Sequence, residues 1–267
     1  MAGWDDILRE LGDTPSQTDI VRRKYLKALS NYTGRNTIAY YSAFLTRSVA
    51  GTDINDSDMT GFMNALKGMD CSKGLDLILH TPGGSPAAAE AIVSYLRSKF
   101  HNDIRVIVPQ ISMSAGTMIA CAAKVIIMGK QSSLGPIDPQ FNGIPAYNIK
   151  AEFEEAKADL AVHPENAQYW AIKLQQYPAA FMKTALDAIE LSSNLITVWL
   201  GSCMYNSSIP EEKAIVENIV QQLNEHDRSK THGRHFNIDF CRDIGLKIEE
   251  MEKDNRCLLY TSPSPRD

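Results

Sequence analysis

The sequence of 267 residues lacks three features that would each point to a particular class of protein. Basic residues are not in excess: 27 Lys and Arg stand against 32 Asp and Glu, and the formal net charge of −5 argues against a nucleic-acid-binding surface. The five cysteines are odd in number and form no C-x-x-C pair, so neither a disulfide framework nor a zinc knuckle is expected. No run reaches about 18 apolar residues, the length of a membrane-spanning helix. Because the acidic N-terminus is also unlike a signal peptide, these absences predict a cytoplasmic protein.

The two ends of the chain differ in pattern from its middle. Residues 1–35 are predicted to form a helical lead-in, with amphipathic helices over Trp4–Leu11 and Asp19–Tyr32. Residues 257–267 depart abruptly from the preceding amphipathic pattern and have the look of a translated sequencing-adaptor tail. We therefore expect the folded domain over residues 36–256, a length that can bury a substantial core.

Buried strands that alternate with helices are predicted for the first half of this domain. Short runs of branched apolar residues indicate strands over Leu75–His80, Ile104–Val108 and Val125–Met128, and Asn36–Leu45 has a strand-like composition. From Pro86 onward apolar residues recur at helical spacing, and Ala115–Ala123 is predicted to be a short apolar helix. This alternation indicates an α/β fold with a largely parallel sheet that is covered on both faces.

The second half is predicted to be mostly helical. The expected helices are Ala151–Leu160, Asn166–Tyr177, Ala179–Met204 and Glu211–Asp227, and a short helix and a strand follow in HGRHFNIDFCRDIGLKI. The long segment Ala179–Met204 is more apolar than a lone surface helix requires. It is therefore either the core of a helical layer or an oligomer contact.

Two turns at the ends of predicted strands contain the residues that are candidates for catalysis. The first, HTPGGS, contains Gly83 and Gly84, which can adopt a positive φ and turn backbone N–H groups toward an anion. The second, SMSAG, places Ser112 and Ser114 at a strand-to-helix turn, where hydrolases expose a nucleophilic Oγ. The free N–H of Ala115 would stabilise an oxyanion there. In open α/β folds this edge of the sheet is where ligands bind.

Each turn also has a purely structural interpretation. A glycine pair can simply close a tight turn between a strand and a helix, and a Ser before a helix is a common N-cap. Two such turns after consecutive strands favour a functional site, because together they supply a nucleophile and oxyanion donors from one edge of the sheet.

The two turns and the segment that follows them resemble a known family. LILHTPGGSPAAAEAI, followed by SMSAGTMIACAAKVIIMGKQSSLGPIDPQ, is similar to the Clp protease/crotonase superfamily. Within it the sequence looks most like the serine dehydrogenase proteinases, which are related to signal peptide peptidases and NfeD-type serine peptidases. The similarity is dense over Leu75–Gln140 and returns over Thr231–Ile248. It implies a spiral of parallel strands flanked by helices, a helical C-terminal half, and a serine peptidase activity that needs no metal or organic cofactor.

The resemblance implies roles for the residues of both turns. Carried over by position, it makes Ser114 the nucleophile. The backbone N–H groups of Gly83 or Gly84, together with that of Ala115, would form the oxyanion hole, and Ser112 would support the turn.

The general base does not follow from the same motifs. Clp proteases have a His near the position of Asp138 in GPIDPQ, and no His lies between His101 and His163, which disfavours a Ser-His-Asp arrangement. Peptidases with a Ser–Lys dyad resemble this pattern better, and Lys150 follows Ser114 at a spacing close to that of the NfeD-type lysine. A lysine can act as a base only if burial lowers its pKa well below about 10.4.

Other residues near these motifs keep alternatives open. Lys157 and Lys173 could replace Lys150 as the base, and each of the three can equally be an ordinary solvated lysine. Asp138 either orients a partner or ends a strand. His232 and His235, in HGRH, lack companion metal ligands, so a structural, supporting or substrate-facing role is favoured over a metal site.

The sequence thus predicts a serine endopeptidase that acts on a peptide or protein substrate and, by resemblance, forms a homo-oligomer. Membrane association through a partner is left open. Two other functions compete with this one. In the crotonase branch the same turns would hold an acyl-CoA thioester, and a catalytically inactive scaffold would keep the fold without a base.

Overall fold

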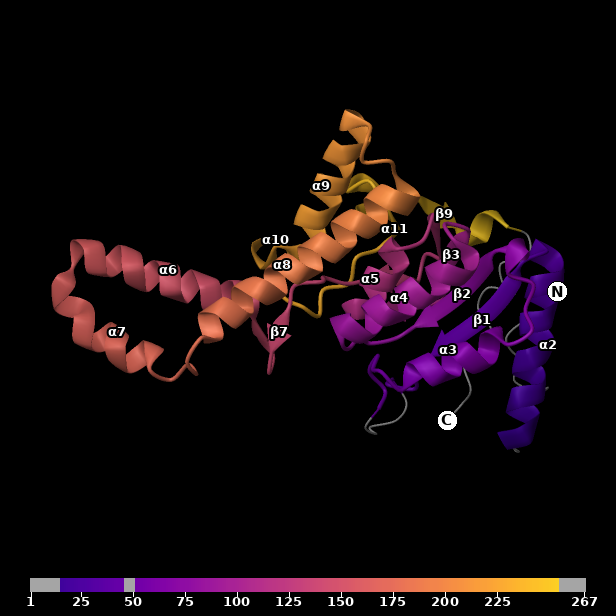
Figure 1. The fold of residues 1–267 in the computed structure, drawn as a ribbon, viewed down its shortest axis with the longest axis horizontal. Helices are drawn as coiled ribbons and strands as arrows, with labels where there is room; N and C mark the ends of the chain where they lie inside the picture. The colour runs from indigo at the N-terminus through magenta and orange to yellow at the C-terminus, as the bar shows by residue number, and fades with distance from the viewer. Residues whose placement is uncertain (1–14, 46–50, 255–267) are drawn as a thin grey trace.

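Five parallel strands form the central sheet of the computed structural model, which describes residues 15–45 and 51–254 (Figure 1). The strands are β1 (Asn36–Tyr41), β2 (Leu75–His80), β3 (Ile104–Val108), β5 (Val125–Met128) and β9 (Ile248–Glu250), in the order β1-β2-β3-β5-β9. Every neighbouring pair is parallel, so all five carboxyl ends meet at one edge of the sheet. The predicted α/β class with a largely parallel sheet is confirmed.

Helices cover both faces of this sheet. On one face α2 (Pro15–Thr33) places Leu29 in a cluster with Ile78, Ile107 and Ile127 from three neighbouring strands. The other face packs against a larger set of helices, namely α3 (Asp58–Leu66), α4 (Pro86–Phe100), α5 (Ala115–Cys121), α9 (Pro210–Asn224) and α11 (Ile238–Asp243). Successive strand residues point to opposite faces, which is why every residue of β2 is buried.

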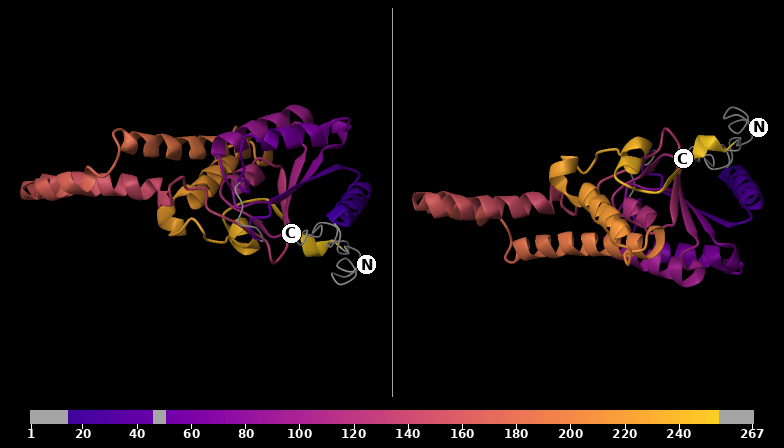
Figure 2. Two further views of the ribbon diagram at one scale, coloured as in Figure 1. Left: turned by 90° about the horizontal axis from the view of Figure 1, so that it is seen from below. Right: turned by 90° about the horizontal axis from the view of Figure 1, so that it is seen from above.

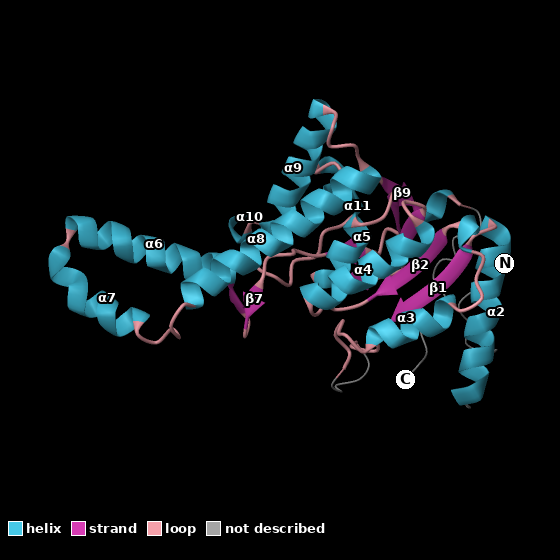
Figure 3. Ribbon diagram, viewed as in Figure 1, coloured by secondary structure: helices cyan, strands magenta, loops and turns pink. Residues whose placement is uncertain are grey.

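A long helical arm projects from the body of the protein (Figures 1 and 2). It consists of α6 (Ala146–Val162), the 3₁₀ turn η2 (Pro164–Asn166), α7 (Ala167–Leu174) and α8 (Phe181–Trp199), which returns to the body and continues as the π-helix η3 (Leu200–Met204). Figure 3 shows the short strand β7 (Gln140–Phe141) at the base of the arm, where it pairs with β8 (Ile144–Pro145). Between α6 and α8 a small apolar cluster forms around Ala146, Ile149 and Ala185.

Short strands beyond the carboxyl edge of the sheet form a second layer. β4 (Ile111–Ser112) pairs in parallel with β6 (Ser133–Leu134). Single bridges extend this layer by joining Thr81 to Ser112, Leu134 to Phe236 and Ile54 to Gly84. The layer therefore ties the turn after β2 to the turn after β3.

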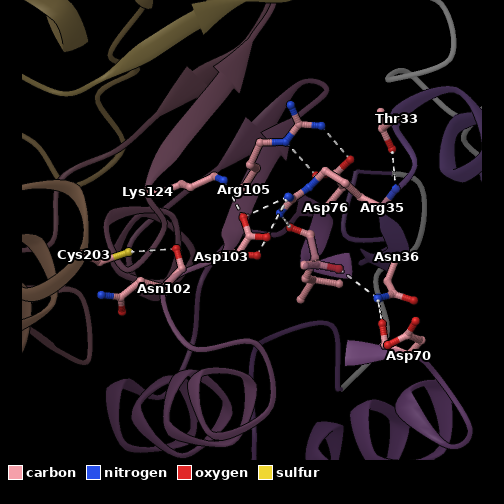
Figure 4. A network of polar contacts seen from close by, with 12 residues as sticks. Thr33, Arg35, Asn36, Asp70, Asp76, Asn102, Asp103, Arg105, Lys124 and Cys203 are labelled. Atoms are coloured by element: carbon pink, nitrogen blue, oxygen red, sulfur yellow. Dashed lines mark hydrogen bonds and ion pairs between the residues drawn. The ribbon is translucent and has the colours of Figure 1, made fainter. Parts of the chain in front are cut away.

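The amino edge of the sheet holds a network of ion pairs (Figure 4). Asp76 on β2 is fully buried, and it accepts hydrogen bonds from Nε of Arg35 (2.7 Å) and from Nε and Nη2 of Arg105 (2.7 and 2.8 Å). Arg35 also pairs with Asp103, which contacts Lys124. These residues stand at the starts of β1, β2, β3 and β5, so the network joins four strands. Breaking a buried ion pair leaves an uncompensated charge and costs about 3–5 kcal/mol, which marks this edge as structural.

The predicted buried strands Leu75–His80, Ile104–Val108 and Val125–Met128 are found with those bounds. The ends of the helices differ more from the predicted bounds. The helix predicted from Ala151 begins at Ala146, where the backbone N–H bonds to Pro139 O, so Lys150 lies within a helix. The helix predicted to Asp227 ends at Asn224, because Glu225 is extended (φ −72°, ψ 111°), and the one-turn helix α10 (His226–Ser229) follows.

Two predicted segments, the helix Trp4–Leu11 and the tail 257–267, lie outside the described residues. Within the described ranges, no helix combines the length and the apolar character that crossing a bilayer requires.

Candidate active site

Ser114 lies at the turn between β4 and α5, in a conformation that few residues adopt. Its backbone has φ 51° and ψ −119°, and α5 begins at the next residue. A non-glycine residue with positive φ is strained, and such strain is found often at functional sites. The side chain is half-buried, and no hydrogen bond to its Oγ is found within the described part of the chain. The structural alternative of a helix cap is therefore absent at Ser114, whose side chain makes no capping bond.

The glycines after β2 pack directly against this serine. Gly83 has φ 105°, and a Cβ placed on it would lie 2.6 Å from Ser114 Cβ and 2.8 Å from Met113 O. Gly84 has φ 146°, and a Cβ there would lie 2.4 Å from both N and O of Ile54. Both positions thus require glycine for conformation and for space. The turns HTPGGS and SMSAG are brought together at one edge of the sheet, as the sequence predicted.

Within the described part of the chain, two backbone N–H groups at this contact remain without acceptors. Gly83 N donates to Thr81 Oγ1 (3.1 Å), so this group is occupied. The residues on either side of Gly84 are both hydrogen-bonded to Ile54: Ile54 N donates to Gly83 O, and Ser85 N donates to Ile54 O. The N–H of Gly84 itself therefore points away from Ile54. Among the described residues, neither Gly84 N nor Ala115 N has an acceptor. Two free donors therefore lie in the two turns that meet at Ser114, which is the requirement for an oxyanion hole.

Ser112 supports the turn through its backbone. Its carbonyl accepts a hydrogen bond from Thr117 Oγ1 (2.9 Å), and that hydroxyl in turn accepts from Gly135 N (3.0 Å). The Ser112 Oγ is buried and has no partner within the described residues. A Cβ on Gly116 would lie 2.6 Å from this oxygen, so the glycine is needed to accommodate it.

Asp138 lies between two histidines that are distant in the sequence. Its fully buried carboxylate accepts from His232 Nδ1 at Oδ1 (2.8 Å) and from His226 Nδ1 at Oδ2 (2.8 Å). Gln140 Nε2 also donates to Oδ2 (2.7 Å). An ionised carboxylate can only accept, so each imidazole donates from Nδ1 and leaves Nε2 free to accept a proton. Despite these two histidines, no cluster suited to a metal ion is found within residues 15–45 and 51–254.

The loops that carry this Asp–His cluster run past the Ser114 turn. A Cβ on Gly135 would lie 2.4 Å from Met113 Cε and 3.5 Å from Arg234 O, so the Gly135 loop lies against the residue that precedes Ser114 and also against the loop of Arg234. His232 is two residues from Arg234 and Asp138 is three from Gly135, which limits their Cα separations to about 7 and 11 Å. The His232 side chain is 30% exposed, whereas that of His226 is 11% exposed. His232 is thus the more accessible of the two imidazoles on Asp138.

The sequence pattern connects neither histidine with Asp138: it predicts only a structural, supporting or substrate-facing role for His232 and gives no role to His226. The positions are separated from Asp138 by 94 and 88 residues, so no local spacing could have revealed the pairs. His235, predicted as a supporting residue, contacts Ser133 Oγ (2.7 Å) on β6.

The three candidate lysines all lie on the arm. Lys150 is 40% exposed and pairs with Glu154 on the same helix (3.8 Å). Lys157 is exposed. Lys173 pairs with Glu152 (2.7 Å), and this hydrogen bond raises the pKa of Lys173, which opposes the change that a lysine base needs. Within the described residues, no hydrogen bond or ion pair joins any of the three to Ser114.

His80 is a further titratable group at this edge. It ends β2 directly before Thr81, is 1% exposed, and stacks between Tyr41 (4.4 Å between ring centres) and Phe44 (5.1 Å). Burial lowers the pKa of its imidazole to about 4. The ring is therefore neutral at neutral pH, and its Nδ1 accepts from Ile111 N (3.4 Å).

We predict that Gly83→Ala disrupts the site. The added methyl group meets Ser114 Cβ at a positive φ, so unfolding should become easier by at least about 2 kcal/mol and labelling of Ser114 by a serine-reactive probe should fall about tenfold or more. Gly143→Ala is the matched control: φ is also positive (82°), but no heavy atom lies within 4 Å. Urea denaturation and labelling rates measure both effects. Equal behaviour of the two variants would contradict the packing of the turns.

We also predict that His80 makes the protein less stable in mild acid. The unfolded chain takes up a proton on His80 below about pH 6.5, whereas the folded protein does so only near pH 4. Stability should therefore fall as the pH drops through this interval, by about 3 kcal/mol in all. Urea denaturation at pH 7 and pH 5 should show a smaller loss for His80→Asn than for the wild type. The same replacement at the exposed His101 should leave the loss unchanged. An unaltered pH dependence of stability in His80→Asn would show that His80 is not the cause of the loss in acid.

Comparison with known proteins agrees with this geometry. Residues 21–164 match the family described as ClpP-like SDH-type serine proteinase, a range that includes both turns and Asp138. The uncharacterized protein MJ0137 of Methanocaldococcus jannaschii is 36% identical over 149 residues, which are 54% of this chain and 52% of that protein. A second protein of that organism, the uncharacterized protein MJ1495, is 45% identical over 75 residues, or 28% of this chain and 25% of its own.

The chain therefore spans about half the length of the first of these relatives and a quarter of the second. The family match covers more than half of this chain, and it agrees with the parallel sheet and with the predicted resemblance. The chain belongs to the family of ClpP-like SDH-type serine proteinases.

Proposed function

We propose that the protein hydrolyses peptide bonds with Ser114 as nucleophile, His232 as general base and Asp138 as the residue that orients His232. One observation carries this proposal: a buried carboxylate holds the Nδ1 of an accessible imidazole, and the loop that leads to this carboxylate contacts the turn of Ser114. This is the arrangement in which an imidazole Nε2 accepts a proton from a serine.

Each residue has a defined role in the proposed reaction. Ser114 Oγ attacks the substrate carbonyl carbon while His232 Nε2 takes the hydroxyl proton. The N–H groups of Gly84 and Ala115 bind the oxyanion that forms. His232 then passes its proton to the departing amine, leaving an acyl group on Ser114. A water molecule, deprotonated by the same imidazole, attacks the ester and regenerates the serine.

Asp138 supports this cycle in two ways. Its hydrogen bond fixes the tautomer of His232 that has a free Nε2, and its charge stabilises the imidazolium formed after proton transfer. Ser114 and His232 need not be hydrogen-bonded without substrate, because such contacts are often long in a free enzyme and shorten in the complex.

A histidine base accounts for the surroundings of Ser114 better than Lys150 does. Lys150 is partly exposed and pairs with Glu154 on its own helix. His232, by contrast, is hydrogen-bonded to the buried carboxylate of Asp138, the contact that orients an imidazole base. The following experiment distinguishes this proposal from the Ser–Lys dyad that the sequence predicts.

The test is covalent labelling by a fluorophosphonate probe, followed by mass analysis of the modified peptide. We expect the wild type to be labelled at Ser114 and Ser114→Ala not to be labelled. His232→Asn should lower the labelling rate by about 10³ or more, because the base is lost while the amide can still bond to Asp138. Lys150→Ala should react like the wild type.

Three outcomes would contradict the proposal. Labelling that survives Ser114→Ala would exclude this nucleophile. A normal rate in His232→Asn with a lost rate in Lys150→Ala would establish the Ser–Lys dyad. No labelling of the wild type, together with thermal stabilisation by an acyl-CoA, would favour the crotonase-like function.

We also propose that the chain self-associates through its arm, as the family resemblance led us to expect. Val162, Tyr169 and Ile172 on α6 and α7 are 71, 59 and 53% exposed, and a second copy would remove them from water. Sedimentation velocity should show the wild type as an oligomer and the double variant Val162→Asp, Ile172→Asp as a monomer. Ile20→Asp, on the opposite end of the molecule and 67% exposed, is the control that should stay oligomeric. A monomeric wild type would contradict the proposal.

A further inference from the structure

His226 is a second imidazole on the carboxylate of Asp138, and the proposed reaction does not use it. It is the first residue of α10, and its Nδ1 donates to Oδ2 of Asp138 (2.8 Å) while His232 holds Oδ1. Its side chain is only 11% exposed. Its own backbone is well fixed, because His226 O accepts from Lys230 N (2.7 Å) and Ser229 Oγ (3.3 Å).

The Asp138 carboxylate depends on few donors. It is fully buried, and in the described part of the protein neither a lysine nor an arginine pairs with it. Its donors are His232 at Oδ1 and, at Oδ2, His226 and Gln140. A buried carboxylate needs such donors, since a buried charge without hydrogen-bond partners is strongly destabilising. His226 is therefore a main support of the charge that orients His232.

We propose that His226 is a positioning residue: it holds Oδ2 of Asp138 so that Oδ1 stays directed at Nδ1 of His232. This inference rests on the proposed function, in which His232 is the base. His226 acts only through Asp138 and touches no reacting atom.

The support from His226 also affects the pH at which His232 works. A carboxylate shared by two imidazoles offers less charge to each, so removal of the His226 hydrogen bond leaves more charge for the His232 imidazolium. The pKa of the base should then rise. Other ionisable side chains lie near this cluster, and Tyr147 and Glu225 are among them. Tyr147 on α6 stays neutral because burial, with Glu225 and Asp138 nearby, raises its pKa to about 12. Glu225 is paired with Arg228 (2.8 Å).

The experiment compares three substitutions at one position. His226→Leu removes the donor. His226→Asn keeps an N–H near the place of Nδ1, whereas His226→Gln carries its amide one bond farther, near the place of Nε2. The second-order rate constant for fluorophosphonate labelling of Ser114 is measured from pH 5 to pH 9 in the full chain, and circular dichroism checks that each variant is folded.

The expected results differ between the variants. His226→Leu should react about 10 to 100 times more slowly at pH 7, and the midpoint of its acid limb should rise by about 0.5–1 pH unit. His226→Gln should be slowed similarly, because its donor is misplaced. His226→Asn should recover most of the wild-type rate and midpoint. A side chain that only filled space would slow the reaction without moving the midpoint.

The outcomes separate this inference from the proposed function. Wild-type rate and midpoint in folded His226→Leu, or in His226→Gln if the leucine variant does not fold, would overturn the role of His226. So would a rate that is lost in all three variants while His232→Asn reacts normally, since His226 would then be the base. A wild type that is not labelled at Ser114 would instead overturn the proposed function.

Discussion

The close contact between Gly83 and Ser114 is the constraint on which the candidate site depends. A side chain at position 83 would overlap Ser114 Cβ at 2.6 Å, and both residues have a positive φ. Such a contact is possible only where two neighbouring parallel strands end at the same edge and both chains turn sharply. The parallel pairing of β2 with β3 and the short layer of β4 and β6 provide this geometry. The strained serine and the free N–H groups of Gly84 and Ala115 follow from it.

The two edges of the sheet carry different groups of polar residues. At the amino edge, the buried Asp76 carboxylate joins the starts of the strands through the charged side chains of Arg35 and Arg105. At the carboxyl edge the polar groups are left less completely paired: Ser112 Oγ is buried without a partner among the described residues, and Ser114 is half-buried. The ion pairs thus lie at the edge where no chemistry is proposed, and the strained turns lie at the opposite edge, with the candidate site.

The second half of the site comes from a part of the chain beyond the family match. Asp138 lies within residues 21–164, whereas His226 and His232 lie outside. Backbone hydrogen bonds help to connect the parts: Ile137 N bonds to Leu223 O, and Leu134 bridges to Phe236. Leu223 and Phe236 lie on either side of the two histidines in the chain, so these bonds bring the histidine-bearing segment to Asp138. The helical arm leaves the body between these two parts, so the chain completes the site only after it has returned along α8.

The sequence by itself determined the three buried strands β2, β3 and β5, their parallel class and the two turns at Ser114, but not the short strands β4, β6, β7 and β8. Each predicted feature follows from local signals: short branched apolar runs, a glycine pair and a serine before an apolar helix. Helix ends were less certain, because Ala146 and Glu225 are set by backbone contacts and dihedral angles that side-chain patterns do not record. Only the tertiary structure decided which residues surround Asp138. Its partners are 88 and 94 residues away, and two positions that far apart share no periodicity or spacing. Their meeting depends on how the helices pack, so the base could be sought only once the chain was folded.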